Sequence, residues 1–292
     1  MIVDMGKIKA KLKFAYDNYE YKSDSSEVKA IKQEDDLTKK IDWLEGILDG
    51  VYTQEENGEL WIVFRGTDPN RKSDNVNMKM LPHRLPYVGV NPKIWVHTGL
   101  IDLYDRPECR GILKKKVTDA LNRGLKIWVI GHSQGGGMAQ ICAVDLQCTF
   151  SDRLNENNFF VVPVAPMRAG NKHFVKSFNR RIPNAVLTWK GSDMVPHIPP
   201  VWFGYHLPGY RVNVDPRSFF RKIGNFFWAA IKFPFVGRKD IHKNPDRFIS
   251  WLTILASGPD WYFINDHDVD DWPEVKINTE ELSINKVNKV KA

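Results

Sequence analysis

The sequence predicts an α/β protein in which a mostly parallel sheet is covered by helices on both faces. Short runs of consecutive apolar residues, typical of strands buried on both faces, alternate with segments of helical periodicity. The chain has 292 residues, of which 42% are hydrophobic and 26% are charged, so it can build a substantial core. We therefore expect one globular domain over residues 1–272, followed by a polar, Lys-rich tail over residues 273–292.

The expected elements follow one another along the chain. Residues 7–45 are charged and partly helical, because apolar residues continue at helical spacing through Ile41 and Leu44. Residues 69–93 should be irregular, and residues 97–123 should form a helix. The remaining expected elements are strands at 60–64, 125–130, 159–164 and 185–189, and a helix at 136–146.

Residues 216–239 form a candidate helical insertion with an amphipathic pattern. Phe219, Phe220, Ile223 and further apolar residues recur at three- and four-residue spacing, which places them on one helix face. Basic residues flank this face, so residues 217–232 are predicted to contact an anionic membrane surface. The alternative is a helix whose apolar face packs against the sheet, because core helices show the same pattern.

Composition excludes several function classes. The formal net charge is +7, but no zinc-finger or similar motif favours nucleic acid as a partner. The three cysteines, Cys109, Cys142 and Cys148, form neither a metal-binding pair nor an even disulfide set, so we expect no metal and no cofactor. The sequence contains no apolar leader and no run of about 18 apolar residues. We therefore expect a cytoplasmic protein, with peripheral membrane contact as an option.

One short motif carries the predicted chemistry. Gly131-His132-Ser133-Gln134-Gly135 follows an expected strand and precedes an expected helix. A serine hydroxyl is a poor nucleophile at neutral pH, and a tight strand–turn–helix connection exposes it for attack. Side chains at Gly131 and Gly135 would clash across such a turn. Ser133 is therefore the candidate nucleophile.

Four motifs in a fixed order extend this interpretation. They are Phe64-Arg65-Gly66-Thr67, His97-Thr98-Gly99-Leu100, the motif around Ser133, and Gly191-Ser192-Asp193-Met194-Val195-Pro196-His197-Ile198-Pro199-Pro200. Together they resemble class 3 lipases, the family of fungal triacylglycerol lipases and related phospholipases, over residues 40–214, with a weaker resemblance that extends to 272. The resemblance implies an α/β-hydrolase fold and hydrolysis of carboxylic esters of lipids through an acyl-enzyme. It also implies a lid at residues 71–93, where Met78, Met80, Leu81 and Leu85 would cover the site.

The resemblance assigns further roles around Ser133. The oxyanion of the tetrahedral intermediate would be bound by the backbone N–H of Gln134 and by Thr67, the hydroxyl residue that follows Arg-Gly. Asp193 lies just past an expected strand and would orient the catalytic histidine.

Several histidines follow Asp193 and are candidates for the general base. His267 is favoured, since its Asp-His-Asp string precedes an aromatic residue by the expected distance, and His242 is the alternative base. His197 lies in a Pro-rich turn, His206 matches a non-catalytic family position, and His132 is expected to support the turn.

Other functions remain open at this stage. A thioesterase, an acyltransferase or a peptidase could use the same residues, since one fold hosts many functions. A short-chain esterase and a non-catalytic, lipid-surface binding protein are further alternatives.

Overall fold

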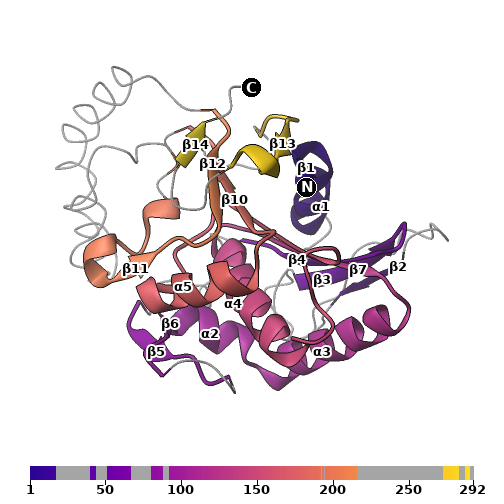
Figure 1. Cartoon of the computed structure of the whole chain (residues 1–292), viewed down its shortest axis with the longest axis horizontal. Coiled ribbons are helices and arrows are strands. Elements are labelled where there is room, and N and C mark those ends of the chain that lie inside the picture. The colour runs from indigo at the N-terminus through magenta and orange to yellow at the C-terminus, as the bar shows by residue number, and fades with distance from the viewer. Residues whose placement is uncertain are drawn as a thin grey trace, which may run out of the picture.

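The computed structural model describes residues 1–17, 40–43, 51–66, 80–87, 92–191, 193, 195–215, 272–282 and 287–289. A sheet of eight strands crosses the centre of this part of the chain, in the order β14-β12-β10-β8-β7-β4-β3-β2 (Figure 1). Strands β4 to β14 of this sheet run parallel to one another, and β3 and β2 add two antiparallel strands at one edge. Its strands are β2 (Lys40–Trp43), β3 (Val51–Glu56), β4 (Glu59–Phe64), β7 (Lys126–His132), β8 (Phe159–Val164), β10 (Val186–Trp189), β12 (Tyr210–Asn213) and β14 (Val287–Lys289).

Helices cover both faces of this sheet. Four helices lie on one face and α1 lies on the other, above the sheet in Figure 1. The helices are α1 (Met5–Asp17), α2 (Thr98–Tyr104), α3 (Pro107–Asn122), α4 (Gln134–Thr149) and α5 (Lys172–Arg181). The predicted α/β class with a mostly parallel sheet is therefore confirmed.

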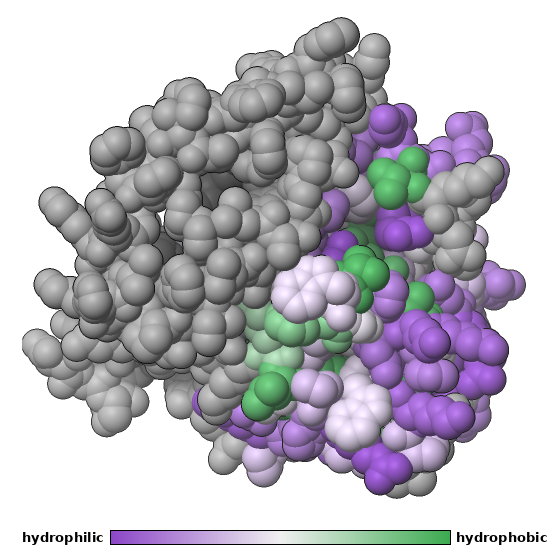
Figure 2. All heavy atoms as spheres, turned by 90° about the vertical axis from the view of Figure 1, so that its left-hand side faces the viewer, coloured by the Kyte–Doolittle hydropathy of each residue, from purple (hydrophilic) through white to green (hydrophobic). Residues whose placement is uncertain are grey.

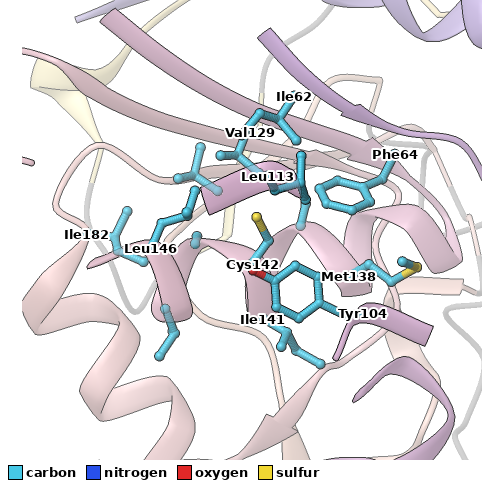
Figure 3. Close-up of a cluster of buried hydrophobic side chains, with 14 of the residues drawn as sticks. Ile62, Phe64, Tyr104, Leu113, Val129, Met138, Ile141, Cys142, Leu146 and Ile182 are labelled. Carbon is cyan, nitrogen blue, oxygen red and sulfur yellow. The ribbon is translucent and has the colours of Figure 1, made fainter. Parts of the chain in front are cut away.

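Alternation along the central strands explains why both faces are apolar. In β4, Leu60 and Ile62 belong to the core under α2 to α5, whereas Trp61 and Val63 belong to the core under α1. Successive side chains of a strand point to opposite faces, so a strand covered on both sides reads as an unbroken apolar run. Figure 3 shows the larger core, in which Ile62 and Val129 of the sheet face Leu113, Cys142 and other residues of the helices.

Two smaller sheets complete the described fold. A four-stranded antiparallel sheet has the order β11-β9-β6-β5 and lies beside α5 and α2. Its strands are β5 (Pro82–Arg84), β6 (Trp95–His97), β9 (Gly170–Asn171) and β11 (Tyr205–His206). The other sheet pairs β1 (Ile2–Asp4) with β13 (Lys276–Asn278). Short 3₁₀ turns are η2 (Val195–His197), η3 (Val201–Phe203) and η6 (Thr279–Glu281).

Several predicted elements are corrected by the structure. The helical spacing through Ile41 is misleading, because residues 40–43 pair as a strand with β3. The helix expected over 97–123 is two helices, since Pro107 begins α3 after a break at Asp105 and Arg106. Within the expected lid segment, residues 82–84 form a strand, and Leu85 is buried in the main core and does not cover the site.

The prediction of a polar tail from residue 273 is also wrong for the described strands. Residues 276–278 pair with β1, and Ile277 is buried. Residues 287–289 pair in parallel with β12 at the sheet edge. A polar sequence can add an edge strand, because strand pairing uses backbone groups. The candidate helical insertion at 216–239 lies outside the described residues.

No helix in the described ranges is long and apolar enough to cross a membrane.

Candidate active site

Ser133 occupies a strained turn between the central strand β7 and the buried helix α4. Its backbone has φ 57° and ψ −123°, a conformation that costs an L-residue about 1–3 kcal/mol. Hydrogen bonds hold it there: its N–H donates to the carbonyl of Val164 in β8 at 3.0 Å, and its carbonyl accepts from the N–H groups of Gly137 and Met167 at 3.2 Å each. The predicted strand–turn–helix context of the nucleophile is therefore present.

The glycines of the motif make this turn sterically possible. A Cβ atom on Gly131 would collide with the carbonyl oxygen of Gly135 across the turn. A Cβ atom on Gly135 would collide with the carbonyl oxygens of Phe64 and Arg65. The requirement for Gly at both positions thus comes from backbone packing against the turn and the end of β4.

Gly66 brings the end of β4 against the nucleophile. A Cβ atom on Gly66 would lie 3.0 Å from Cβ of Ser133 and 3.1 Å from the carbonyl oxygen of His132. The next residue, Thr67, lies outside the described residues.

Tyr16 of helix α1 joins the two backbone segments that flank Ser133. Its hydroxyl accepts the N–H of Gly66 at 3.1 Å and lies 2.7 Å from Nδ1 of His132. Because the hydroxyl oxygen accepts from Gly66, its proton is available to donate to Nδ1, which is the acceptor in the Nε2–H tautomer. The guanidinium of Arg65 lies 5.6 Å from the centroid of the Tyr16 ring. His132, the residue directly before the nucleophile, thus contacts Tyr16 through both its Nδ1 atom and its ring.

Gln134 is the first residue of α4, directly after the nucleophile. The first N–H groups of a helix have no acceptor within that helix, and the helix dipole favours negative charge at this end. Both properties are those required of the predicted oxyanion donor.

Asp193 lies past the carboxyl end of β10 and is fully buried. Its Oδ1 accepts the N–H of Val195 at 2.9 Å, and its own N–H donates to the carbonyl of Lys190 at 3.1 Å. Strands β10 and β7 are separated by β8 alone, so these two parallel strands lie about 10 Å apart, and Asp193 and Ser133 both follow strand ends at the same edge of the sheet. A histidine placed between them would therefore have to come from another segment.

Arg168 ties the turn after Asp193 to the segment that contacts Ser133. The neighbouring Met167 donates to the carbonyl of Ser133, while the N–H of Arg168 donates to Ile198 at 2.7 Å. The Arg168 guanidinium donates to the carbonyls of His197 and Pro199 at 3.0 and 3.1 Å. Burial lowers the pKa of this side chain to about 10, with a smaller contribution from Arg211.

Sequence reasoning missed the contributions of Tyr16 and Arg168. Tyr16 lies 116 residues before its partner His132, so no local pattern could connect them. Arg168 had the weak signal of a position shortly after a buried strand.

The described histidines occupy other environments. His97 caps α2, His132 contacts Tyr16, and Nδ1 of His197 lies 3.5 Å from the Arg168 guanidinium. His173 and His206 line a separate cavity, and His83 lies in the exposed strand β5. Both histidines predicted as the base, His267 and His242, lie outside the described residues.

Among the described residues, no group of three or more His, Cys, Asp or Glu side chains is arranged to hold a metal ion. Cys109 and Cys142 are buried, and burial raises the pKa of both thiols.

Comparison with known proteins identifies the family of this chain. Residues 61–203 match the family model described as Lipase (class 3), and this segment contains Ser133, Gln134 and Asp193. Residues 61–203 belong to the class 3 lipase family. A lipase from Rhizomucor miehei is 32% identical over 162 residues, which cover 54% of this chain and 42% of that lipase. A mono- and diacylglycerol lipase from Fusarium solani is 30% identical over 125 residues, covering 41% and 35%.

Solved structures of lipases give the same fold. A triacylglycerol lipase whose catalytic centre is formed by a serine protease triad superimposes with a TM-score of 0.51 at 28% identity. The superposition covers 59% of this chain and 66% of that chain. The propeptide complex of a Rhizomucor miehei lipase deletion mutant gives a TM-score of 0.52 at 29% identity, over 60% and 56% of the two chains. The predicted α/β-hydrolase fold is therefore confirmed.

The comparison with these lipases also bears on two predictions, the activity and the location of the protein. The chain spans about two fifths of the length of the curated lipases from Rhizomucor miehei and Rhizopus niveus. The expectation of a cytoplasmic protein is wrong, because several relatives, from Malassezia globosa and Fusarium solani, are secreted. That expectation rested on the lack of an apolar leader, and an absence of this kind does not determine a location.

Proposed function

We propose that this chain hydrolyses carboxylic esters of lipids, as a triacylglycerol lipase or a phospholipase of the A type. The observation that carries the proposal is the backbone of Ser133, held at φ 57° between β7 and α4 inside the segment that matches class 3 lipases. The protein tolerates such a conformation because packing on every side of the turn enforces it, and strain of this kind is concentrated at functional sites. No cofactor is needed for the reaction.

In the proposed mechanism, a histidine removes the proton from Oγ of Ser133 as the oxygen attacks the ester carbonyl carbon. The resulting oxyanion accepts hydrogen bonds from the N–H of Gln134 and from Thr67. The tetrahedral intermediate then collapses, and the histidine passes its proton to the departing alcohol. Water, deprotonated by the same histidine, hydrolyses the acyl-enzyme and releases the fatty acid. Asp193 orients the histidine and stabilises its charged form.

We assign the base to His267, with His242 as the alternative. Support comes from Trp272, five residues after His267, which is buried in the core cluster that also contains Val164 and Ala165. Those two residues lie at the carboxyl end of β8, between the strands that lead to Ser133 and Asp193. Five residues of extended chain reach about 17 Å, which is enough to bring His267 to this edge of the sheet.

Labelling with a fluorophosphonate tests the proposal. We expect the wild-type protein to be labelled at Ser133, and Ser133→Ala to lose both the label and about three or more decades of ester hydrolysis. A Ser133→Ala protein within tenfold of wild-type activity would exclude the mechanism. His267→Ala should abolish turnover while His242→Ala retains it, with folding checked by circular dichroism, and the reverse result would assign the base to His242.

The remaining candidate functions predict different results. A thioesterase or an acyltransferase would be labelled at Ser133 but would prefer a thioester or an alcohol acceptor over emulsified acylglycerols. A lipid-surface protein without activity would bind vesicles and would not be labelled.

We also propose that residues 217–232 contact anionic membrane surface, on the strength of their amphipathic pattern. Vesicle co-sedimentation tests this: Arg221→Glu and Lys222→Glu should weaken binding to anionic vesicles only. The names of the secreted relatives support action outside the cell that makes the protein.

A further inference from the structure

A cavity of about 530 Å³ opens beside the four-stranded sheet, separate from the turn of Ser133. Three neighbouring strands and the start of α5 build its wall, because Gly170 and Asn171 of β9 pair with His206 and Tyr205 of β11, and Gly170 also pairs with β6. The described residues that line it are Lys93, Trp95, Asn171, Lys172, His173, Gly204 and His206. Neither Ser133, Gln134 nor Asp193 is among them.

The segments around this cavity are rich in positive charge. Residues 80–87, 92–97, 170–181 and 195–211 contain no Asp or Glu, but they supply Lys93, Lys172 and His206 to the cavity wall. Burial lowers the pKa of His206, and the charges of Arg168, Lys172 and Arg211 lower it further. Each of these neighbouring charges is positive, so an anion in the cavity would relieve repulsion among them.

Large apolar side chains stand exposed at the rim of the same cavity. Turn η3 carries Val201, Trp202 and Phe203 with 51%, 56% and 47% of their surfaces exposed, and it ends at Gly204 in the cavity wall. Trp95, which lines the cavity, is 42% exposed. Figure 2 turns the side of the molecule that carries β11 toward the viewer and shows apolar and aromatic side chains gathered there, bordered by hydrophilic ones. Clustered exposed aromatic residues typically mark a contact with a partner or a lipid surface.

We propose that this face docks on the surface of an anionic phospholipid aggregate, with a lipid phosphate in the cavity and Trp202 and Phe203 inserted beneath the head groups. This proposal rests on the proposed lipase function. It adds which face of the molecule contacts the lipid, and that the lipid head groups are anionic. Lys172 and Lys93 supply charge-assisted hydrogen bonds for a phosphate. Trp and Phe gain from leaving water at the head-group boundary, where the polar edge of Trp remains hydrated. A small soluble anion would use the cations and would not require the exposed aromatic turn.

Vesicle co-sedimentation in the Ser133→Ala background tests the surface without hydrolysis of the vesicles. We expect binding to vesicles of phosphatidylcholine with phosphatidylglycerol, and weak binding to phosphatidylcholine alone. Lys172→Gln should weaken binding to anionic vesicles about 5-fold, which is the contribution of one positive charge near such a surface. Trp202→Ala should weaken it about 10-fold, because it removes buried apolar area. The matched controls on α3 are Lys115→Gln, also an exposed lysine, and Ile112→Ala, also an exposed apolar residue, and both should bind as the parent does.

A second readout separates this proposal from the proposed function. Lys172→Gln and Trp202→Ala, made with Ser133 intact, should hydrolyse a soluble short-chain ester at the parental rate and lose activity only on anionic aggregates. If Ser133 proves inactive, vesicle binding still tests the surface. The proposal would be overturned by any of three results. These are an equal loss of binding in the α3 controls, unchanged binding in both Lys172→Gln and Trp202→Ala, and a loss of binding confined to Arg221→Glu and Lys222→Glu. It is also overturned if inorganic phosphate binds the cavity and anionic vesicles do not bind.

Discussion

At the residue scale, Ser133 is held by contacts that approach it from distant parts of the chain. Tyr16 connects Gly66 to His132, and Arg168 connects the turn after Asp193 to the segment after β8. These polar contacts fix the backbone on each side of the nucleophile, where a shift of a fraction of an ångström would misalign the oxyanion donors.

Tyr16→Phe should lower kcat about 5- to 10-fold on a soluble ester while KM changes little. The ring remains, but the hydroxyl that joins Gly66 and His132 is lost. Loss of these hydrogen bonds should raise the activation free energy by about 1 kcal/mol. Steady-state kinetics measure the effect. Tyr104→Phe is the matched control, because it removes a buried hydroxyl that donates to Asp145 at 2.9 Å, away from the turn. A kcat loss of the same size in Tyr104→Phe would mean that Tyr16 acts only through general stability.

Gly135→Ala and Gly111→Ala should shift stability in opposite directions. The Cβ atom at Gly135 would meet the backbone carbonyls of Phe64 and Arg65 at the end of β4, so the helix must move, which costs about 1–3 kcal/mol. Gly111 lies within α3 with no atom within 4 Å of the added Cβ, so alanine there should stabilise by about 0.5–1 kcal/mol. Urea unfolding followed by circular dichroism measures both, and a tolerated Gly135→Ala would contradict the packing described here.

At the scale of elements, one buried carboxylate joins three helices. Asp145 of α4 is 1% exposed and accepts two hydrogen bonds from Arg110 at 2.8 Å each and one from Tyr104 at 2.9 Å. Lys114 lies 3.1 Å from the same carboxylate. The helix that presents Ser133 is therefore attached to α2 and α3 by a satisfied polar network at its far end.

Asp145→Ala should destabilise the fold by about 3 kcal/mol, because the buried hydroxyl of Tyr104 loses its acceptor and Arg110 keeps only the partly exposed Asp105 as an ion-pair partner. Asp119→Ala, an exposed carboxylate on α3, should change the free energy of unfolding by less than about 0.5 kcal/mol. Denaturant titrations at low and high salt measure both. A small or strongly salt-dependent effect at Asp145 would indicate a solvated ion pair.

At the scale of the whole molecule, the second face of the sheet is closed by the two ends of the described chain. Val3, Ile8 and Leu12 from β1 and α1 pack with Trp272 and Ile277 against the central strands. These residues lie outside the segment that matches class 3 lipases, 61–203. The strands of the matched segment therefore depend on α1 to cover their second face.

Leu12→Ala should cost about 2–5 kcal/mol, since Leu12 is fully buried in this second core. Ile112→Ala, at a 39% exposed position, should cost much less. Removal of residues 1–17 would uncover an apolar sheet face and remove Tyr16, so we expect insoluble, inactive protein. Solubility and thermal unfolding measure these outcomes, and a soluble, active deletion protein would show that α1 is dispensable.

The sequence by itself determined the features that depend on neighbouring residues. The central strands can be predicted from the sequence because strands buried on both faces must be apolar throughout, as in residues 60–64. The turn of Ser133 can be predicted because Gly131 would clash with Gly135 inside the same motif, whereas the clash at Gly135 is with Phe64 and Arg65 and depends on the fold. The resemblance added Asp193, which lies buried past the end of β10.

Tertiary structure alone decided the features that depend on pairing across the chain. Ile41 has helical spacing yet lies in an edge strand, because β3 offers it backbone partners. Residues 287–289 read as a polar tail and instead pair with β12 for the same reason. Tyr16 reaches His132 across 116 residues, and Trp202 stands exposed beside a basic cavity built from three separate strands. Contacts of this kind leave no local pattern in the sequence, since each partner is chosen by the fold that brings the two segments together.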